Sequence, residues 1–333
     1  MIPIVVSMGD PAGIGPEIIA KAWAARVEHA LPPFVVIGDP RAMAAVWQGS
    51  IVEVATVGHV SATFGDALPV MAVDACGTIM PGRPDVDGAR SALEALETAT
   101  ALARSGAARA LVTAPVGKAQ LYQIGFTPPG QTEFVADRCG VSRDDAVMML
   151  AGPSLRVVPI TTHVPLTDVP RLLTIDLIVA KARVTARELS DSFGVAHPRL
   201  AFAGINPHAG ESGALGREEI EVIEPAIEQL RAEGIDATGP FAADTMFHPR
   251  ARDRYDVAMC AYHDQALVPL KTLHFDEGVN VTLGLPIVRT SPDHGTAFGI
   301  AGRDKANPGA MIAAIRMADT LASNRQHRAA ARS

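Results

Sequence analysis

Residues 3–27, PIVVSMGDPAGIGPEIIAKAWAARV, decide the fold class of this chain. The apolar run Pro3–Met8 predicts a buried strand, the Gly-rich segment predicts a tight turn, and apolar positions recur at helical spacing from about Pro16 to Val27. The segment lacks the third glycine of the dinucleotide fingerprint and the Gly-Lys-Ser/Thr of a P-loop. It therefore indicates either a tight turn that requires glycine or an anion-binding loop at a helix N-terminus.

The same alternation of strand and helix continues along the chain. Phe34–Gly38 and Ala110–Ala114 are strand-like, whereas 87–104 and 169–193 are helical in pattern. This order predicts an α/β fold with a mostly parallel sheet, whose ligands bind beyond the carboxyl ends of the strands. A length of 333 residues favours two lobes with a cleft between them. The break Pro128-Pro129-Gly130 marks a crossover between the lobes.

Composition narrows the function class. The chain has 48% hydrophobic and 20% charged residues, which is typical of a globular enzyme, and its net charge of −7 disfavours nucleic-acid binding. Cys76, Cys139 and Cys260 are odd in number and widely spaced, so they are expected to be small buried residues in a reducing compartment. No apolar run approaches the roughly 20 residues of a membrane span, and no leader is evident. The expected location is the cytoplasm.

Residues 260–311 carry the densest set of chemically special side chains. Lys271, Asn280 and Arg289, the last placed where a strand ends, supply an ammonium, an amide and a guanidinium. Fixed donors of this kind recognise carboxylate and phosphate through charge-assisted hydrogen bonds. The stretch therefore predicts a site for a small anionic ligand.

Three histidines share one context. His163, His208 and His263 each follow an apolar strand within a few residues and are predicted to lie in loops. Each alone is explained as a hydrogen-bonding loop residue. Together they could hold a divalent metal at the open edge of a sheet and leave positions for substrate.

The motifs GDPAGIGPE, TAPVGK, TEF, TTHVPL, NPHAGE, ADT, YHDQ, GVNVTLGLP and RTSPDHGTA occur in this order across the chain. In this order they resemble the 4-hydroxythreonine-4-phosphate dehydrogenase family of vitamin B6 biosynthesis. The tail HGTAFGIAGRDKANPGAMI also resembles the adenosine-binding segment of isocitrate and isopropylmalate dehydrogenases. This second resemblance implies their two-lobed α/β/α sandwich with the active site in the interlobe cleft. It also implies an NAD site unlike the Rossmann fingerprint.

The resemblance implies a nucleotide-binding lobe of residues 1–125 and 288–333, and a metal, substrate and dimerisation lobe of residues 126–287. It further implies a homodimer in which His163 and His208 of one subunit and His263 of the other bind a divalent metal (Zn, Mg, Mn or Co). The implied substrate-binding residues are Gln131, Thr132, Lys271, Asn280 and Arg289. The implied contacts to NAD or NADP are Gly13, Gly15, Asp293, His294, Gly295, Thr296 and Asn307.

One position departs from the family pattern. Gln131 stands where the family usually has histidine, and an amide cannot exchange a proton near neutral pH. A role in orienting the substrate survives, but an acid/base role does not. The change leaves room for a related substrate, such as threonate or erythronate 4-phosphate or a cyclic cis-diol carboxylate.

The expected reaction is NAD-dependent oxidation of 4-phosphooxy-L-threonine at C3 followed by decarboxylation to 3-amino-2-oxopropyl phosphate, with a metal that stabilises the developing alkoxide. Lys271 or a metal-bound water would remove the proton. Asp244 and Asp264 are candidate partners that orient the site, or simply loop-capping aspartates. Two other classes stay open: a three-histidine metal hydrolase or hydratase that needs no nicotinamide, and a non-catalytic anion-binding protein.

Overall fold

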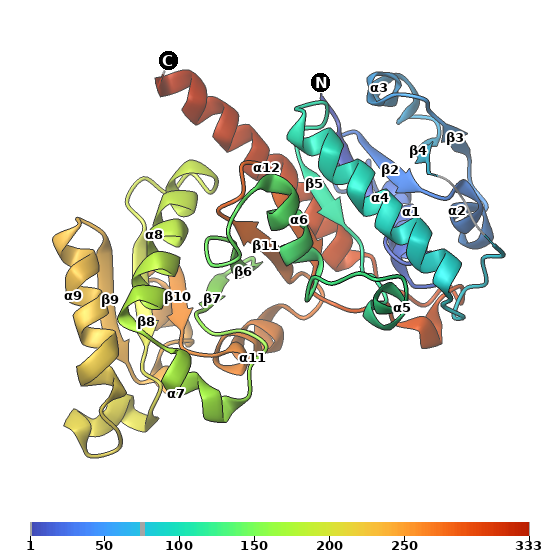
Figure 1. Cartoon of the computed structure of the whole chain (residues 1–333). Helices are drawn as coiled ribbons and strands as arrows, with labels where there is room; N and C mark the ends of the chain where they lie inside the picture. Colours follow the sequence, from blue (N-terminus) through green and yellow to red (C-terminus); the bar gives the residue numbers. More distant parts are fainter. Residues whose placement is uncertain (1, 74–76, 333) are drawn as a thin grey trace. The chain divides into compact units, whose positions relative to one another are not determined.

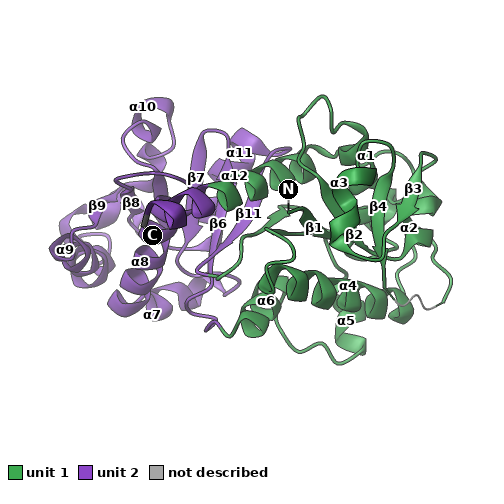
Figure 2. Ribbon diagram, turned by 90° about the horizontal axis from the view of Figure 1, so that it is seen from above, with its two compact units in different colours: residues 1–140, 285–323 green, residues 141–284, 324–333 purple. Residues whose placement is uncertain are grey.

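The computed structural model describes residues 2–73 and 77–332 and divides the chain into two compact units (Figure 2). Unit 1 consists of residues 1–140 and 285–323, and unit 2 of residues 141–284 and 324–333. The compact units divide at 140/141 and 284/285, whereas the resemblance implied lobe boundaries at 125/126 and 287/288. Residues 126–140 group with unit 1, where Arg138 pairs with Glu97 at 2.7 Å and Gln131 Nε2 donates to the Ala114 carbonyl at 3.1 Å.

Unit 1 contains a parallel sheet whose described strands follow the order β3-β4-β2-β1-β5-β12. Its strands β1, β2 and β5 are buried along their whole length, as in a parallel sheet covered on both faces. Helices α4 and α1 lie on opposite sides of this sheet (Figure 2). The strands are β1 (Ile4–Ser7), β2 (Phe34–Gly38), β3 (Ile51–Glu53), β4 (Leu68–Ala72), β5 (Leu111–Thr113) and β12 (Arg289–Pro292). The helices are α1 (Gly15–Ala24), α2 (Pro40–Val46), α3 (Val60–Thr63), α4 (Val86–Arg104), α5 (Lys118–Gln123), α6 (Gln131–Cys139) and α12 (Gly309–Arg332), of which α12 belongs to unit 1 only as far as Ser323.

Unit 2 contains a mixed sheet in the order β11-β6-β7-β10-β8-β9. Strand β6 is antiparallel to both β11 and β7, and the pairs from β7 to β9 are parallel, so the prediction of a mostly parallel sheet is confirmed (Figure 1). The strands are β6 (Val147–Gly152), β7 (Leu155–Pro159), β8 (Arg199–Ala203), β9 (Asp236–Phe241), β10 (Val257–Cys260) and β11 (Val279–Leu283). The helices are α7 (Val169–Leu172), α8 (Ile175–Asp191), α9 (Glu224–Ala232), α10 (Pro249–Arg252) and α11 (His263–His274).

Strand β1 of unit 1 lies at a topological switch point, between β2 and β5. The loops that follow β1 and β5 interlock there. Gly9 has a φ of +74°, and a Cβ on it would lie 2.3 Å from the Pro115 carbonyl oxygen. A Cβ on Gly15 would lie 2.3 Å from the Met8 carbonyl oxygen. The glycines of the GDPAGIGPE segment are therefore required by backbone packing and positive φ.

One helical prediction needs correction. The single helix predicted over 169–193 is broken into α7 and α8 at Leu173 and Thr174, because the Thr174 side chain accepts the Leu177 N–H and caps the new helix. A π-helix, Glu219–Ile223, precedes α9, and Pro225 lies in the first turn of α9, where its missing N–H costs no intrahelical hydrogen bond. The basic C-terminal segment continues α12 and belongs to unit 2 from Asn324 on, and within that unit Arg325 pairs with Glu188 at 2.8 Å.

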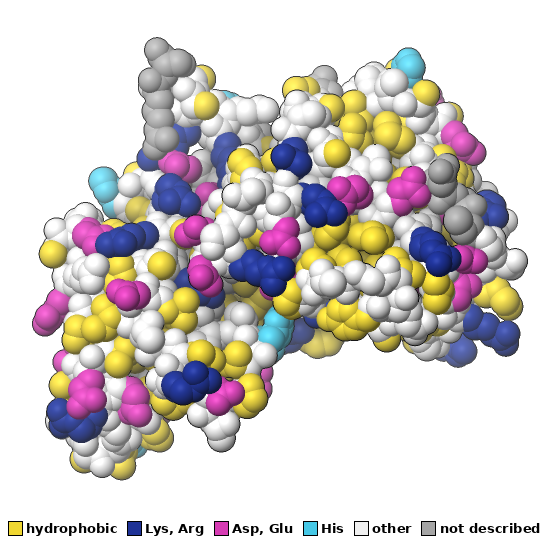
Figure 3. All heavy atoms as spheres, in the orientation of Figure 1, with side chains coloured by type: hydrophobic (Ala, Val, Ile, Leu, Met, Phe, Trp, Pro, Cys, Tyr) yellow, Lys and Arg dark blue, Asp and Glu magenta, His cyan; other side chains and the backbone are white. Residues whose placement is uncertain are grey.

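The surface carries interspersed charges, as on the visible face of unit 2 around α9 (Figure 3). Arg183 pairs with Glu233 and Arg199 with Asp256 in this unit. Cys260 is fully buried and Cys139 partly exposed, both as free thiols, whereas Cys76 lies outside the described residues. Over residues 2–73 and 77–332, the helices are all too short or too polar to cross a membrane.

Candidate active site

Three histidines follow neighbouring parallel strands in unit 2. His163 follows β7, His208 follows β8 and His263 follows β10, and these strands are adjacent in the order β7-β10-β8. Because the carboxyl ends of parallel strands meet at one edge of a sheet, the predicted recurrence of histidine at strand ends has a structural basis. One detail differs from the prediction: His263 is the first residue of α11 rather than part of a loop.

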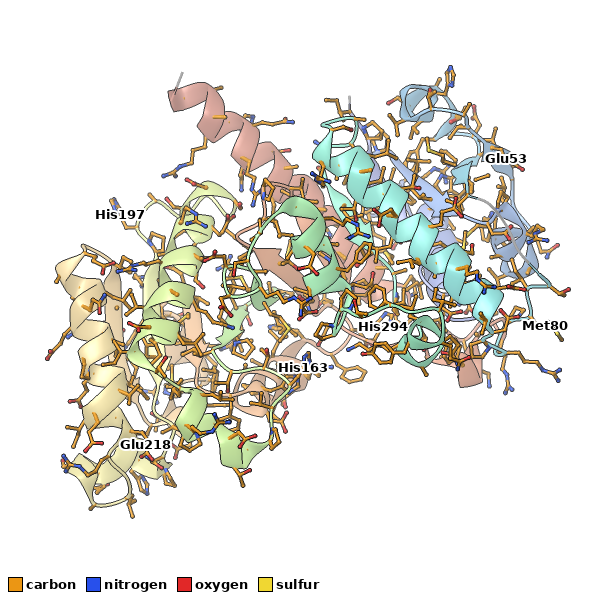
Figure 4. All side chains as sticks on the ribbon, viewed as in Figure 1. Glu53, Met80, His163, His197, Glu218 and His294 are labelled. Carbon is orange, nitrogen blue, oxygen red and sulfur yellow. The ribbon has the colours of Figure 1, made fainter. Side chains whose placement is uncertain are left out.

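His163 and His263 of the same chain lie close together, with ring centroids 5.5 Å apart and ring planes inclined by 43° (Figure 4 labels His163). His263 Nδ1 is 2.7 Å from Asp264 Oδ1. A carboxylate can only accept, so Nδ1 is the donor of this pair, and the neutral imidazole with this tautomer would present the Nε2 lone pair to a metal. Asp264 thus contacts the His263 ring, and its role in orienting a metal ligand stays a prediction.

An open pocket of about 440 Å³ extends along α11 next to this pair. Its lining residues recur at helical spacing on one face of the helix, so His263 and Lys271 point into the same space. The pocket is lined by His263, Asp264, Leu267, Val268, Lys271 and Thr272. The arrangement places an imidazole and an ammonium on one wall.

His208 lies in a strained loop. It is the first of five consecutive residues with left-handed backbone angles, four of which carry a Cβ. Such residues cost roughly 1–2 kcal/mol each, so the surrounding structure must hold them. The buried Glu219 does so: its Oε1 accepts the Asn206 N–H at 2.8 Å, and its Oε2 accepts Asn206 Nδ2 at 3.0 Å. A Cβ on Gly210 would lie 2.6 Å from Glu219 Oε2, so the loop closes around this carboxylate.

The predicted metal centre is only partly assembled in one chain. Among the described residues, no group of three or more His, Cys, Asp or Glu side chains is close enough to hold a metal ion. His163 and His263 are near enough to occupy two neighbouring ligand positions. The pairing of these two within one chain was not implied by the family resemblance, which takes His263 from the other subunit.

The remaining predicted residues of unit 2 lie in different settings. Asn280 is inside β11, opposite Leu150 of β6, and its Oδ1 is buried without a hydrogen-bond partner among the described residues. Asp244 is exposed in a short 3₁₀ turn, Ala243–Thr245. Asn280 therefore offers a buried acceptor, and Asp244 offers a solvated carboxylate.

Arg289 of unit 1 is the centre of a second cluster. It begins β12 instead of ending a strand, and it is 3% exposed. Its Nη2 donates to Thr113 Oγ1 at 2.6 Å and its Nη1 donates to Thr132 Oγ1 at 3.1 Å. Burial lowers the pKa of Arg289 to about 10, opposed by the charge of Glu133. The guanidinium stays charged at neutral pH and is aimed by two hydroxyl groups.

Gln131 and Thr132 open helix α6, whose N-cap, Gly130, makes no side-chain capping bond. Gln131 Nε2 donates to the Ala114 carbonyl at 3.1 Å. Because a carbonyl can only accept, this bond distinguishes the nitrogen of the amide from its oxygen. The Oε1 end is then buried without a hydrogen-bond partner in the described structure. A helix N-terminus and a buried cation together favour an anion in unit 1.

The predicted nucleotide segment is tied to the first loop of the chain. Ile14 N–H donates to the Thr296 carbonyl at 3.0 Å, and a Cβ on Gly13 would lie 3.1 Å from the same oxygen. Asn307 Oδ1 accepts the Gly309 N–H at 2.9 Å at the start of α12. These contacts give Gly13, Gly15 and Asn307 structural roles. Direct contact of these residues with NAD stays a prediction. The same holds for Asp293, His294, Gly295 and Thr296, of which His294 is labelled in Figure 4.

The sequence did not single out Thr113 or Asp10. Thr113 appears as part of TAPVGK, but only the structure shows that its hydroxyl holds Arg289. Asp10 is 1% exposed in the loop after β1, and burial raises its pKa to about 6, opposed by hydrogen bonds from Ala12 and Gly117. Its position beside the switch point, within GDPAGIGPE, was the available signal.

Residues 30–318 match the family described as pyridoxal phosphate biosynthetic protein PdxA. A 4-hydroxythreonine-4-phosphate dehydrogenase of Zymomonas mobilis is 58% identical over 326 residues, which cover 98% of this chain and 97% of the relative. An Erythrobacter litoralis protein of the same name is 54% identical and is matched over 97% of each chain. The crystal structure of 4-hydroxythreonine-4-phosphate dehydrogenase from Klebsiella pneumoniae is 36% identical, with a TM-score of 0.86 over 97% of this chain and 100% of that one. The chain therefore belongs to the PdxA family of dehydrogenases.

Proposed function

We propose that this chain oxidises 4-hydroxythreonine-4-phosphate (4-phosphooxy-L-threonine) at C3 with NAD or NADP and then releases CO2 to give 3-amino-2-oxopropyl phosphate. The relatives named for this substrate match the chain from end to end, and the family is described as acting in pyridoxal phosphate biosynthesis. Membership of a dehydrogenase family also removes the reason for a hydrolase or hydratase assignment. A cytoplasmic location, expected from the cysteine pattern, belongs to the same proposal.

The observation that carries the proposal is the buried Arg289. A guanidinium removed from water is strongly stabilised by an anion, and phosphate or carboxylate matches its planar donors. Thr113 and Thr132 fix its orientation, and the N-terminus of α6 adds backbone donors next to Thr132. Unit 1 would hold one anionic end of the substrate at this cluster.

Gln131 presents an acceptor to the ligand. Its Nε2 is engaged by Ala114, so only the buried Oε1 remains for recognition. An acceptor is satisfied by an ammonium or a hydroxyl and repels phosphate and carboxylate oxygens. The substrate amino group fits, and so does the hydroxyl of a four-carbon sugar acid, which keeps threonate and erythronate 4-phosphates as the alternative substrates.

Unit 2 would supply the chemistry at C3. His163, His208 and His263 would hold a divalent metal, with His263 oriented by Asp264. Such a metal polarises a bound hydroxyl and lowers its pKa. Lys271, which shares a pocket with His263, would accept the proton from the C3 hydroxyl while the C3 hydrogen leaves as hydride to the nicotinamide. In the resulting β-keto acid the bond to the carboxyl carbon breaks, its electrons move to the ketone, and CO2 leaves.

A homodimer is the third part of the proposal. Large apolar side chains are exposed near His163 and along α11: Leu166 is 65%, Val268 61% and Phe275 76% exposed. Apolar side chains gathered beside a candidate site are typical of an interaction surface. A second copy seated there would bring a further set of ligands to His163 and His208.

The test is NADH formation by purified protein with 4-hydroxythreonine-4-phosphate, before and after chelation and metal restoration, with threonate and erythronate 4-phosphates in parallel. We expect metal-dependent NADH formation with the amino-acid phosphate. Activity with the sugar-acid phosphates alone would assign a sister substrate to the same site, and no NADH from any of them would overturn the proposal.

A further inference from the structure

Gln265 is a buried side chain of unit 2 that the proposed reaction does not use. It is 9% exposed, and both ends of its amide are engaged by backbone groups. Oε1 accepts the Ala261 N–H at 2.7 Å, and Nε2 donates to the Gly204 carbonyl at 2.8 Å. The second bond joins residues 61 positions apart in the sequence.

The two backbone groups belong to loops that carry histidines. Ala261 precedes His263 by two residues, and Gly204 directly follows β8, where the loop to His208 begins. The third loop joins the same network, because the Ala261 carbonyl accepts the Thr161 hydroxyl at 2.8 Å and the Thr161 N–H at 3.2 Å. Thr161 precedes His163 by two residues.

Helix capping explains only half of this arrangement. Gln265 lies in the first turn of α11, where a side chain that reaches back to a backbone N–H is common. A glutamate would serve that purpose equally well. An ionised glutamate can only accept, whereas the glutamine amide accepts from one backbone group and donates to the other, so the bond to Gly204 requires the amide.

We propose that Gln265 is a positioning residue that sets the three histidine-bearing loops relative to one another. It acts through the backbone at Ala261 and Gly204, with Thr161 as the link to His163. Its benefit to metal binding rests on the proposed function, but the coupling of the loops does not.

The experiment uses full-length protein and two readouts. In the metal-free protein, amide hydrogen exchange is measured at Ala261 and over 205–208. The affinity for Zn²⁺ or Co²⁺ alone is measured by titration. Gln265→Glu keeps the acceptor for Ala261 and loses the donor to Gly204, and Gln265→Leu loses both. We expect faster exchange at 205–208 in both variants, faster exchange at Ala261 only in Gln265→Leu, and metal binding weakened by about 10- to 100-fold.

Matched variants separate positioning from general loss of a buried hydrogen bond. Thr185→Val removes a buried hydroxyl of α8 that bonds within its own helix, and it should change neither readout. Thr161→Val should weaken metal binding, and Thr161→Ser should restore it, which keeps the test decisive if Gln265→Leu does not fold. Wild-type exchange and metal affinity in Gln265→Glu and Thr161→Val would overturn the proposal. If the wild-type protein binds no metal, the metal centre fails, while the exchange result still decides the coupling of the loops.

Discussion

The two units hold their candidate ligand-binding side chains in opposite ways. Unit 1 does so in the Arg289 cluster, and unit 2 does so at the sheet edge that carries His163, His208 and His263. In unit 1 the charged group itself is buried, and side-chain hydroxyls of Thr113 and Thr132 aim it. In unit 2, His163 and His208 are exposed and have positive φ angles. Their side chains are not fixed by burial; instead the backbone of the loop that carries His208 is held by hydrogen bonds to Gln265 and Glu219.

Under the proposed function, the Arg289 cluster would be a complete subsite and the metal centre of unit 2 an incomplete one. A buried guanidinium needs only its anion, because its geometry is set before binding. Exposed imidazoles in a strained loop need further ligands to define a centre, and the described residues of one chain bring only His163 and His263 close together. We therefore expect unit 2 to depend on metal and partner, and unit 1 to depend on neither.

The largest effect should come from the histidines. His208→Ala and His263→Ala homodimers should each lose metal-dependent turnover by at least about 1000-fold, because three-ligand sites rarely tolerate loss of a ligand. If the site is shared, co-refolded mixtures of the two variants contain hybrid dimers with one intact site, and about a quarter of wild-type activity should return. The readout is NADH formation across mixing ratios. Mixtures that stay inactive would place all three ligands in one chain and break the proposed dependence of unit 2 on a partner.

Arg289→Lys should lower kcat/KM by about 100- to 1000-fold, because lysine cannot replace the two-donor fork held by Thr113 and Thr132. Metal affinity measured by titration should be unchanged if unit 1 is independent of the metal. Arg109→Lys is the matched control, since Arg109 is also a buried arginine of unit 1, paired with Asp319. Equal kinetic losses in both variants would show a general effect of buried charge instead of substrate binding.

Asp10 should make unit 1 sensitive to pH. Its pKa is raised from 3.8 to about 6 by burial, so the folded state binds the proton more tightly than the unfolded state. The stabilisation is fully present below pH 3.8 and is lost as the pH rises to about 6, by up to about 3 kcal/mol. The free energy of unfolding is measured by urea titration of wild type and Asp10→Asn between about pH 4 and pH 7, a range that runs from near the lower pKa value to above the higher one. It should fall less with rising pH in the variant than in the wild type. An identical decline in both proteins would contradict this assignment.

The smallest effect should follow loss of one aiming hydroxyl. Thr113→Val should raise KM about tenfold with little change in kcat, because one hydrogen bond to a charged group contributes roughly 1.5–3 kcal/mol. Thr132→Val is expected to raise KM by a similar factor, again with little change in kcat. Thr100→Val, which removes a buried hydroxyl bonded to Leu96 in α4, controls for the loss of a buried hydrogen bond. A fall in kcat alone would argue that Thr113 acts on chemistry instead of substrate position.

Local patterns accounted for most elements because strand and helix periodicity reflect burial of nearby side chains. Phe34–Gly38 was predicted with its observed bounds, and the α4 prediction began only one residue late. The break between α7 and α8 was missed because it depends on one capping hydroxyl, Thr174. The compact units divide after Gly140, whereas the resemblance implied a boundary after residue 125, and a contact such as Arg138–Glu97, which joins residues 41 positions apart, is one that no local pattern records.

The sequence by itself determined the α/β class, the family resemblance and the occurrence of histidine at the ends of strands, since these follow from residue order and spacing. Only the tertiary structure decided that His163 and His263 meet, that Thr113 aims Arg289, and that Gln265 joins Ala261 to Gly204. The physical reason is sequence distance. These contacts join residues 100, 176 and 61 positions apart, and only the crossover order of the strands brings such residues together.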